Sequence, residues 1–445
     1  MVPQQPTATW FFLGRALAHP NYRLYFIGQG ISLVGTWMTR LATGWLVFRT
    51  AGHNAPLMLG LVSFAGQIPT FFLAPLAGAL VDRWNRHRTL LVTQILSLVQ
   101  SALLAVVAFR GGSGTGFIAQ IITLSLAQGL INSFDMPARQ VLLVQLVTRR
   151  EDLPNAIAMN SFLVNGGRLV GPALAGILIA AFGEAWCFVI DSASYLAVVV
   201  SLMLMRLPPV QVKRGPVSLW SGLVEGFTYA FGFAPIRALI LLLATVSFLG
   251  MPYNVLLPLF VDQLGGGPYT LGFLTAASGI GAVAGAVLLA SRRSVVGLGR
   301  LIVMAALVFG LALICFACSS LLWLSLLLML ATGFGMMVQM AASNTILQTI
   351  ADEDKRGRVM SFYSMAFLGM APFGSLLAGF LAGYIGVQAT VALSGVGVLL
   401  GALAFGFQLK RLRSLVRPIY VRLGILPEVA EGLEVAADLT RPPAD

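Results

Sequence analysis

Long apolar runs separated by short polar turns dominate the chain. The runs are continuous rather than alternating, which favours helices over β-strands, and most reach the roughly 20 residues needed to cross a bilayer. Backbone groups in lipid must satisfy their hydrogen bonds within the segment, so each run is predicted to be a transmembrane helix. The predicted spans cover residues 22–50, 57–81, 89–109, 116–146, 155–182, 184–206, 236–262, 270–291, 300–318, 320–350, 359–384 and 386–408.

The longest internal polar stretch divides these twelve spans into six and six. It contains the segment "SLWSGLVEGFTYAF", whose apolar residues recur at helical spacing, so we expect an amphipathic helix on the membrane surface. The expected parts are an interfacial N-terminal segment, a first bundle, a cytoplasmic linker, a second bundle and a cytoplasmic tail, at residues 1–21, 22–207, 208–235, 236–408 and 409–445.

The two halves repeat each other in sequence. The stretch "GPALAGILIAAFG" at 171–183 is similar to "GSLLAGFLAGYIG" at 374–386, and "PLMLGLV" at 56–62 is similar to "PYTLGFL" at 268–274. Duplicated membrane bundles place a substrate site between the repeats near the bilayer midplane. The predicted fold is therefore an all-α membrane protein with two pseudo-symmetric six-helix bundles.

Composition supports lipid as the solvent. Apolar residues make up 58% of the chain and charged residues 10%, whereas a soluble domain carries about 25% charge. The mean hydropathy is +0.88. No soluble fold of this length can cover so much apolar surface.

The basic residues define an orientation. Only Arg49 and Arg110 fall on the side opposite the termini, and Arg40, Arg139 and Arg168 fall inside spans; the rest of the 28 Lys and Arg lie on the side of both termini. The positive-inside rule then predicts that both termini are cytoplasmic and that the chain spans a plasma membrane. The net charge of +12 is thus explained by membrane orientation and does not indicate nucleic-acid binding.

Candidate chemistry is sparse outside the charged residues. The three cysteines lie in apolar runs and no His falls within a span, so neither a metal site nor a cofactor is expected. An intramembrane enzyme is disfavoured because no clustered acid pair or nucleophile motif occurs. The expected partners are the lipid bilayer, a small-molecule substrate and protons, and the protein is expected to be a monomer.

The turn "GALVDRWNRHR" (78–88) between spans two and three carries a recognisable motif. It resembles the loop signature G-x-x-x-D-R/K-x-G-x-R/K-R/K of the major facilitator superfamily. The matching residues are Gly78, Asp82, Arg83 and Arg88, while Asn85 replaces a glycine and His87 a basic residue. This resemblance implies the superfamily fold and alternating-access transport.

Span five carries a second motif, "GGRLVGPALAG" (166–176). It resembles the export-associated element G-x-x-x-G-P-x-x-G-G, with Gly167, Gly171, Pro172 and Gly176 in the matching positions and Ala175 in place of a glycine. Pro172 removes a backbone donor and the glycines allow close helix approach, which is consistent with a bend that seals one side. A glycine-rich packing face alone is the other interpretation.

Span four contains an ion pair, Asp135 and Arg139, on one helix face with Pro137 between them. A charge at mid-helix costs roughly 2.5–3.5 kcal/mol, and an apolar pair would be as stable, so stability alone does not explain the pair. The resemblance implies an inner-side latch with the arginines of the preceding loop, made of Gly78, Asp82, Arg83, Arg86, Arg88, Asp135 and Arg139. A proton or substrate site and an inert pair remain alternatives.

Three further charges lie inside the spans. Asp191 in span six is the second proton-coupling candidate after Asp135, and its position near the outer face predicts hydration. Arg40 and Arg168 are expected to face the cavity and attract an anionic substrate, or else to reach the interface or bind backbone carbonyls. In the second half, the polar cavity candidates are Asn254, Gln339, Asn344 and Gln348.

The function that fits these features is secondary active export. The stretches "GTWMTRLATGWLV" (35–47), "DRWNRHR", "DMPAR" and "LPNAIAMNS" (153–161) are similar to the superfamily branch of the enterobactin exporter and drug efflux proteins. The expectation is a transporter that moves a drug-like compound or siderophore out of the cytoplasm in exchange for protons. The alternatives are an importer or lysophospholipid flippase of the same fold, or a non-transporting membrane sensor.

Overall fold

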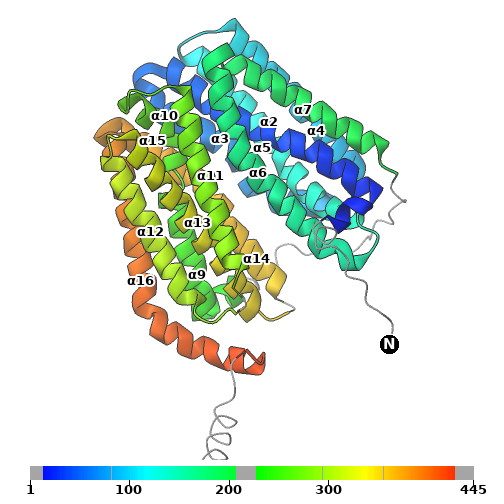
Figure 1. The fold of residues 1–445 in the computed structure, drawn as a ribbon, viewed down its shortest axis with the longest axis vertical. Helices are drawn as coiled ribbons and strands as arrows, with labels where there is room; N and C mark the ends of the chain where they lie inside the picture. The colour runs from blue at the N-terminus through cyan, green and yellow to red at the C-terminus, as the bar shows by residue number, and fades with distance from the viewer. Residues whose placement is uncertain (1–13, 82, 207–226, 293, 354, 426–445) are drawn as a thin grey trace, which may run out of the picture.

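The computed structural model describes residues 14–425, except 82, 207–226, 293 and 354. Throughout these residues the regular structure is helical, which confirms the all-α class. The helices form two groups that are inclined to each other, one from each half of the sequence (Figure 1). Most of the predicted linker helix lies outside the described residues, as do the first residues of the chain and the end of its tail.

The first group contains six long helices. A 3-10 turn precedes α2, another joins α2 to α3, and a third precedes α6, at Arg15–Ala18 (η1), Gly52–Asn54 (η2) and Arg150–Asp152 (η3). The long helices are α2 Pro20–Ala51, α3 Ala55–Val81, α4 Arg86–Arg110, α5 Thr115–Gln145, α6 Leu153–Phe182 and α7 Glu184–Leu204.

The second group has six rods, two of which are interrupted. A π-helical turn, Val246–Gly250 (η4), connects α9 and α10, and a second, Met365–Gly369 (η5), connects α14 and α15. Such turns insert into a continuing helix. The helices are α9 Ala234–Thr245, α10 Tyr253–Gln263, α11 Pro268–Ala290, α12 Leu298–Cys318, α13 Leu322–Ile350, α14 Arg356–Ser364, α15 Met370–Ile385 and α16 Val387–Arg422.

The described residues contain eleven stretches that are long and apolar enough to cross a membrane. One of them, Pro20–Leu73, has 54 residues and would be about 80 Å long as a straight helix. It includes the turn between α2 and α3, so it holds two spans, which brings the described part of the chain to the twelve predicted. The last helix continues to Arg422, beyond the span end expected at residue 408.

The two halves contact each other through two equivalent helix pairs. In one pair α6 packs on α11, and in the other α3 packs on α15. We call the end of the bundle where α2 begins and α16 ends the termini end, and the opposite end, with the turn between α2 and α3, the far end. Both helix pairs cross near the far end, as the glycine contacts below establish.

Glycines make these crossings possible. A Cβ on Gly176 would lie 2.7 Å from the carbonyl oxygen of Pro268, and one on Gly379 would lie 2.5 Å from that of Pro56. Their partner glycines, Gly272 and Gly60, are equally close to the opposing backbone. Backbones can approach this closely only without side chains. The four glycines belong to the two sequence repeats, so the repeat forms the symmetric interface.

The contact between the halves is lost toward the termini end. Phe162 precedes Gly176 by about four helical turns, on the same face of α6, and is 72% exposed. Met365, at the equivalent place before Gly379, is 47% exposed. A face that packs tightly at the far end is thus uncovered closer to the termini end in both halves. The two helix groups accordingly diverge toward the lower end of Figure 1.

Candidate transport site

A stripe of buried polar side chains along α4 organises the acidic residues of the first half. α4 packs against both α5 and α7. One end of the stripe binds Asp135 of α5 and the other binds Asp191 of α7. The stripe consists of Thr93, Gln94, Ser97, Gln100 and Ser101.

Asp135 is buried, with 4% of the residue exposed, and its carboxylate is well supplied with donors. Thr93 Oγ1 donates to its Oδ1 at 2.9 Å and Gln94 Nε2 donates to the same atom at 2.6 Å. Arg139 donates to Oδ2 through Nε at 3.1 Å and also through Nη2. A carboxylate with two hydroxyl or amide donors and a guanidinium is compensated in charge and in hydrogen bonding.

The other members of the predicted latch lie in and beside the turn between α3 and α4. Gly78 is half-buried in α3, Arg86 is half-buried, and Arg83 and Arg88 are exposed. Asp82 lies outside the described residues. Asp135 accepts hydrogen bonds from Thr93, Gln94 and Arg139, and the two halves are separated at this end. Closure of the latch therefore stays a prediction for the opposite conformation.

The two departures from the family loop pattern have structural roles. Asn85 caps α4, because its Oδ1 accepts a hydrogen bond from the Arg88 amide at 3.1 Å, which is a preferred helix start. His87 Nε2 lies 2.8 Å from the carbonyl oxygen of Leu202 and joins α4 to the end of α7.

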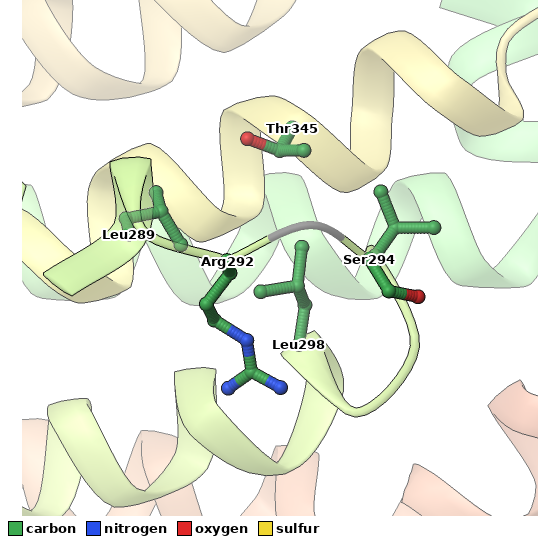
Figure 2. A pocket seen from close by; sticks show the side chains of 6 residues that line it. Leu289, Arg292, Ser294, Leu298 and Thr345 are labelled. Carbon is green, nitrogen blue, oxygen red and sulfur yellow. The ribbon is translucent and has the colours of Figure 1, made fainter.

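The equivalent loop of the second half is built differently. It lies beside a recess lined by Leu289, Arg292, Ser294, Val295, Leu298 and Thr345. Arg292 points away from Thr345 (Figure 2), and its Nη2 donates to the carbonyl oxygen of Val296 at 3.3 Å. The loop ends at Gly297, with a φ of 85°, which favours glycine. Here a guanidinium supports the loop backbone.

Asp191 is in a different situation from Asp135. Only 1% of the residue is exposed, so the expected hydration near the outer face is wrong. Ser101 Oγ donates to Oδ2 at 3.0 Å, and Oδ1 has no hydrogen-bond partner by geometry among the described residues. The carboxyl group packs on α2, where a Cβ on Gly35 would lie 2.7 Å from Oδ1. Thr39 is the next polar neighbour on α2.

Two arginines meet on the other side of α2. The Arg40 guanidinium carbon lies 4.9 Å from the ring centroid of Trp37, and that of Arg168, on α6, lies 5.8 Å from the same centroid. Arg40 is exposed and Arg168 is half-buried. The structure therefore brings together the two arginines that the sequence only placed in separate spans.

The export-associated motif accounts for this meeting. A Cβ on Gly171 would lie 2.6 Å from Cβ of Trp37, and one on Gly167 would lie 3.1 Å from Cβ of Leu33. These two glycines bring α6 onto α2 at the level of the arginines. Pro172 and Gly176 face the other way, against α11. The motif thus builds two interfaces from one helix, and α6 remains helical through Pro172.

The second-half candidates lie in two places. Gln339 is completely buried in α13 and Asn254 donates to the carbonyl oxygen of Met251. Gln348 is exposed and donates to Asn344 Oδ1 at 2.6 Å, so these two form a pair on α13. Among the four candidates, this pair alone combines solvent exposure with side-chain polar groups that are held together.

Trp37 and the polar stripe on α4 were missed by the sequence reasoning. Trp37 precedes Arg40 at a spacing that places both on one helix face, and this could have identified it. The stripe recurs at helical spacing in span three, a pattern typical of a buried polar face.

Metal chemistry has little support in the described ranges. Within them, no group of three His, Cys, Asp or Glu side chains is arranged to hold a metal ion. Cys187 is buried, whereas Cys315 and Cys318 are exposed on α12.

Curated relatives match nearly the whole chain. The staphyloferrin A transporter of Staphylococcus aureus is 25% identical over 401 residues, covering 88% of this chain and 97% of that protein. The multidrug efflux pump Tap of Mycolicibacterium fortuitum is 28% identical, covering 86% and 93%. The enterobactin exporter EntS of Escherichia coli is 25% identical, covering 86% and 90%.

Solved structures support the fold. A bacterial homologue of the human lysosomal transporter Spinster, inward-facing and unoccupied, has a TM-score of 0.64 at 15% identity, covering 88% of this chain and 98% of that one. A D-xylose–proton symporter has a TM-score of 0.66 at 15% identity, covering 89% and 97%. The family model described as transmembrane secretion effector matches residues 15–417. The chain therefore belongs to the transmembrane secretion effector family of major facilitator superfamily transporters.

Proposed function

We propose that this protein exports a small organic molecule from the cytoplasm in exchange for protons. Related proteins are named as siderophore and drug transporters. The basic residues cluster at the termini end, which supports a cytoplasmic location of that end. The halves are separated there and closed at the far end, so this conformation would load substrate from the cytoplasm.

Proton coupling is assigned to Asp191 first, and the observation that carries it is the isolation of this carboxyl group. Among the described residues its neighbours are hydroxyl groups and weak acids: Thr39 from α2, Ser101 from α4, and Ser194, Tyr195 and Cys187 from α7. This set of described neighbours contains no cation. Asp135, in contrast, is paired with Arg139 and is the reserve carrier.

The position of Asp191 links the proton to the substrate site through α2. Gly35 and Thr39 meet Asp191 on one side of this helix. On the other side Trp37 meets α6, and Arg40 lies beside the Trp37 ring. An ionised carboxylate at this depth would favour approach of water or donors, and a neutral one tolerates dry packing. Proton binding would thus change how α2 packs, and a ligand on Arg40 would sense that change. A proton shifts the two states by its differential affinity for them.

The latch completes the cycle at the termini end. When the far end opens, the halves would close over the turn between α3 and α4, and Arg83 or Arg86 would approach Asp135. Arg139 would then share or release the carboxylate. Cysteine pairs placed across α5 and this turn should crosslink in one state of the cycle and not in the other.

Orientation is tested by topology reporters. A cytoplasm-active reporter fused after Asp445 should be active, and an export-dependent reporter at the same place should be silent. The reverse result would place the open end outside the cell, and this conformation would then not load substrate from the cytoplasm.

Transport is tested in two steps. An efflux-deficient bacterial host that expresses the chain is first grown with a panel of antibiotics and siderophore precursors, and raised resistance identifies a substrate. Everted membrane vesicles then take up this substrate only while their interior is acidic, and a protonophore should stop uptake. Uptake that continues unchanged with the protonophore would refute proton exchange, and absence of uptake of any compound would favour the sensor alternative.

A further inference from the structure

Two positive charges at mid-depth lack a negative partner in the described part of the chain. The guanidinium carbons of Arg40 and Arg168 lie 4.9 Å and 5.8 Å from the centroid of the Trp37 ring. Among the described residues, neither guanidinium forms a salt bridge with an Asp or Glu side chain. The other described charges within the membrane depth of this half belong to Asp191, on the opposite side of α2, and to the Asp135–Arg139 pair.

Both arginines are deep in the bilayer. Arg40 lies about three helical turns before the end of α2 at Ala51, and Arg168 lies about four turns before the end of α6 at Phe182. At 1.5 Å per residue these positions are about 16 Å and 21 Å from the far end. This is too deep for the side chains to reach the far interface directly.

The arginines also lie where the two halves meet. The carbonyl oxygen of Arg168 is 3.6 Å from the Cβ position of Gly279 in α11, and Tyr253 of α10 is in electrostatic range of Arg168. The crossing of α6 and α11 at Gly176 and Gly272 lies beyond them, toward the far end. Arg40 is nevertheless exposed. Because the halves are separated on the termini side of this crossing, we expect the site to be reached from the termini end.

Stability does not account for this arrangement. A guanidinium near mid-membrane costs roughly 2.5–3.5 kcal/mol on insertion scales, before repulsion between like charges is added. A contact with an aromatic face returns about 0.5–2 kcal/mol, which is less than the cost. Two such groups, brought together by glycines of the export-associated motif, are expected where a ligand supplies the missing negative charge.

We infer that Arg40, Arg168 and Trp37 form an anion-binding site for an amphipathic organic molecule with two acidic groups, open to the termini end. This inference rests on the proposed function and names the substrate class of the same cavity. Guanidinium groups bind carboxylate or phosphate oxygens bidentately. Since there are two of them, a dianion neutralises the site and a monoanion neutralises half of it. The Trp37 ring lies beside both guanidinium groups, so the rest of the molecule is expected to include an aromatic or apolar part.

The binding test compares an aromatic dicarboxylate with two relatives of lower charge. Naphthalene-2,6-dicarboxylate, its monoamide and its diamide have the same ring and differ only in charge. Each is titrated into the full-length protein in a neutral detergent, by calorimetry, without a membrane or a proton gradient. Affinity is expected to fall at least tenfold from dicarboxylate to monoamide and again to the diamide.

Three variants identify the site. Arg40→Gln and Arg168→Gln should each weaken dicarboxylate binding at least tenfold and abolish the preference over the monoamide. Arg40→Lys should retain part of the affinity, because the charge is kept and the bidentate geometry is lost. Arg110→Gln is the matched control, since Arg110 is exposed at the far end of α4, and it should bind like the parent protein.

Thermal unfolding separates a binding role from a structural one. Removal of an uncompensated charge should leave the melting temperature unchanged or raise it, so Arg40→Gln and Arg168→Gln are expected to be at least as stable as the parent protein. Lower stability in both variants, or equal affinity for dicarboxylate and diamide, would overturn the inference. Dicarboxylate binding that depends on both arginines, in a protein that fails the vesicle assay, would preserve the site and reject only the proposed export.

Discussion

The two halves of the molecule share a scaffold but not their charges. In the register that aligns Gly171 with Gly374, Asp135 and Arg139 of α5 correspond to Val338 and Ala342 of α13. Both of these apolar residues are fully buried. The first half therefore has an ion pair with its hydrogen-bond donors at this place. The second half has small apolar side chains there. The comparison teaches that the fold does not require charge at this position.

The same contrast holds for the other functional candidates. Asp191 corresponds to Ser394, whose hydroxyl donates to the carbonyl oxygen of Thr390 in its own helix, and Arg168 corresponds to Ala371. The glycine crossings, in contrast, are matched in both halves. Close helix packing is thus common to the duplicated unit, whereas at these corresponding positions the ionisable side chains belong to the first half.

The largest effect is expected from neutralising the isolated acid. Asp191→Asn should reduce proton-driven uptake into everted vesicles by about tenfold or more, because the variant no longer has a group at this place whose protonation differs between states. Exchange of substrate without a gradient should persist. The matched change in the other half, Ser394→Ala, should transport like the parent protein. If Asp191→Asn pumps normally and Asp135→Asn does not, the coupling role moves to the latch acid.

Replacing Asp135 and Arg139 by the apolar residues of the second half tests what the ion pair contributes to stability and transport. Arg139→Ala alone should lower the free energy of unfolding by about 3–5 kcal/mol, since it leaves a buried carboxylate unpaired. Asp135→Val combined with Arg139→Ala copies the second half and should recover most of that loss, as measured by thermal unfolding in detergent. Transport by the double variant should remain impaired. A fully active double variant would show the pair to be inert.

The glycine crossing holds the two halves together at the far end. Gly379→Ala puts a Cβ about 2.5 Å from the Pro56 carbonyl, and overpacking of this kind typically costs about 1–3 kcal/mol. Closure of the far end becomes less favourable, so the termini end should close more often. A cysteine at Met365, with Cys315 and Cys318 replaced by Ser, should then be labelled about fivefold more slowly.

Gly383→Ala is the control for that crossing, because nothing described lies within 4 Å of its Cβ position. Labelling at the Met365 position should be unaffected by this change. Equal labelling rates in both glycine variants would mean that the crossing does not control the separation of the halves.

The smallest effect is expected in the loops at the termini end. The first-half loop caps α4 with Asn85, and the second-half loop precedes α12 with Gly297. Asn85→Ala should cost about 1 kcal/mol of stability and Asn85→Gly only a few tenths, measured again by thermal unfolding. A larger loss for glycine than for alanine would mean that Asn85 acts through something other than the cap.

The span count, the duplication and the glycine crossings could be predicted because they follow from local patterns. Apolar length specifies a membrane helix, and small residues at matched places in two repeats, such as Gly60 with Gly272, indicate close packing. The charged residues inside the spans were found for the same reason, since each stands out against an apolar background.

Side-chain contacts between helices were harder to predict from the sequence. The bonds of Thr93 and Gln94 to Asp135, and the burial of Asp191 against Gly35, depend on the rotation of one helix relative to another. A single sequence with many apolar faces does not specify that rotation. Asp191 was expected to be hydrated from its short distance to a helix end, but depth along a helix does not determine which side of it faces a neighbour.

The two glycine crossings also have a mechanical consequence. Because the halves touch along two backbone contacts related by symmetry, these contacts define a line about which one half can turn against the other. From that line the helices extend roughly 30 Å toward the termini end. On an arm of this length a rotation of about 10° displaces the free ends by roughly 5 Å. A small rotation where the glycines meet would thus open or close the termini end by several ångströms. The close backbone contacts that this rotation needs depend on the absence of side chains at Gly60, Gly176, Gly272 and Gly379.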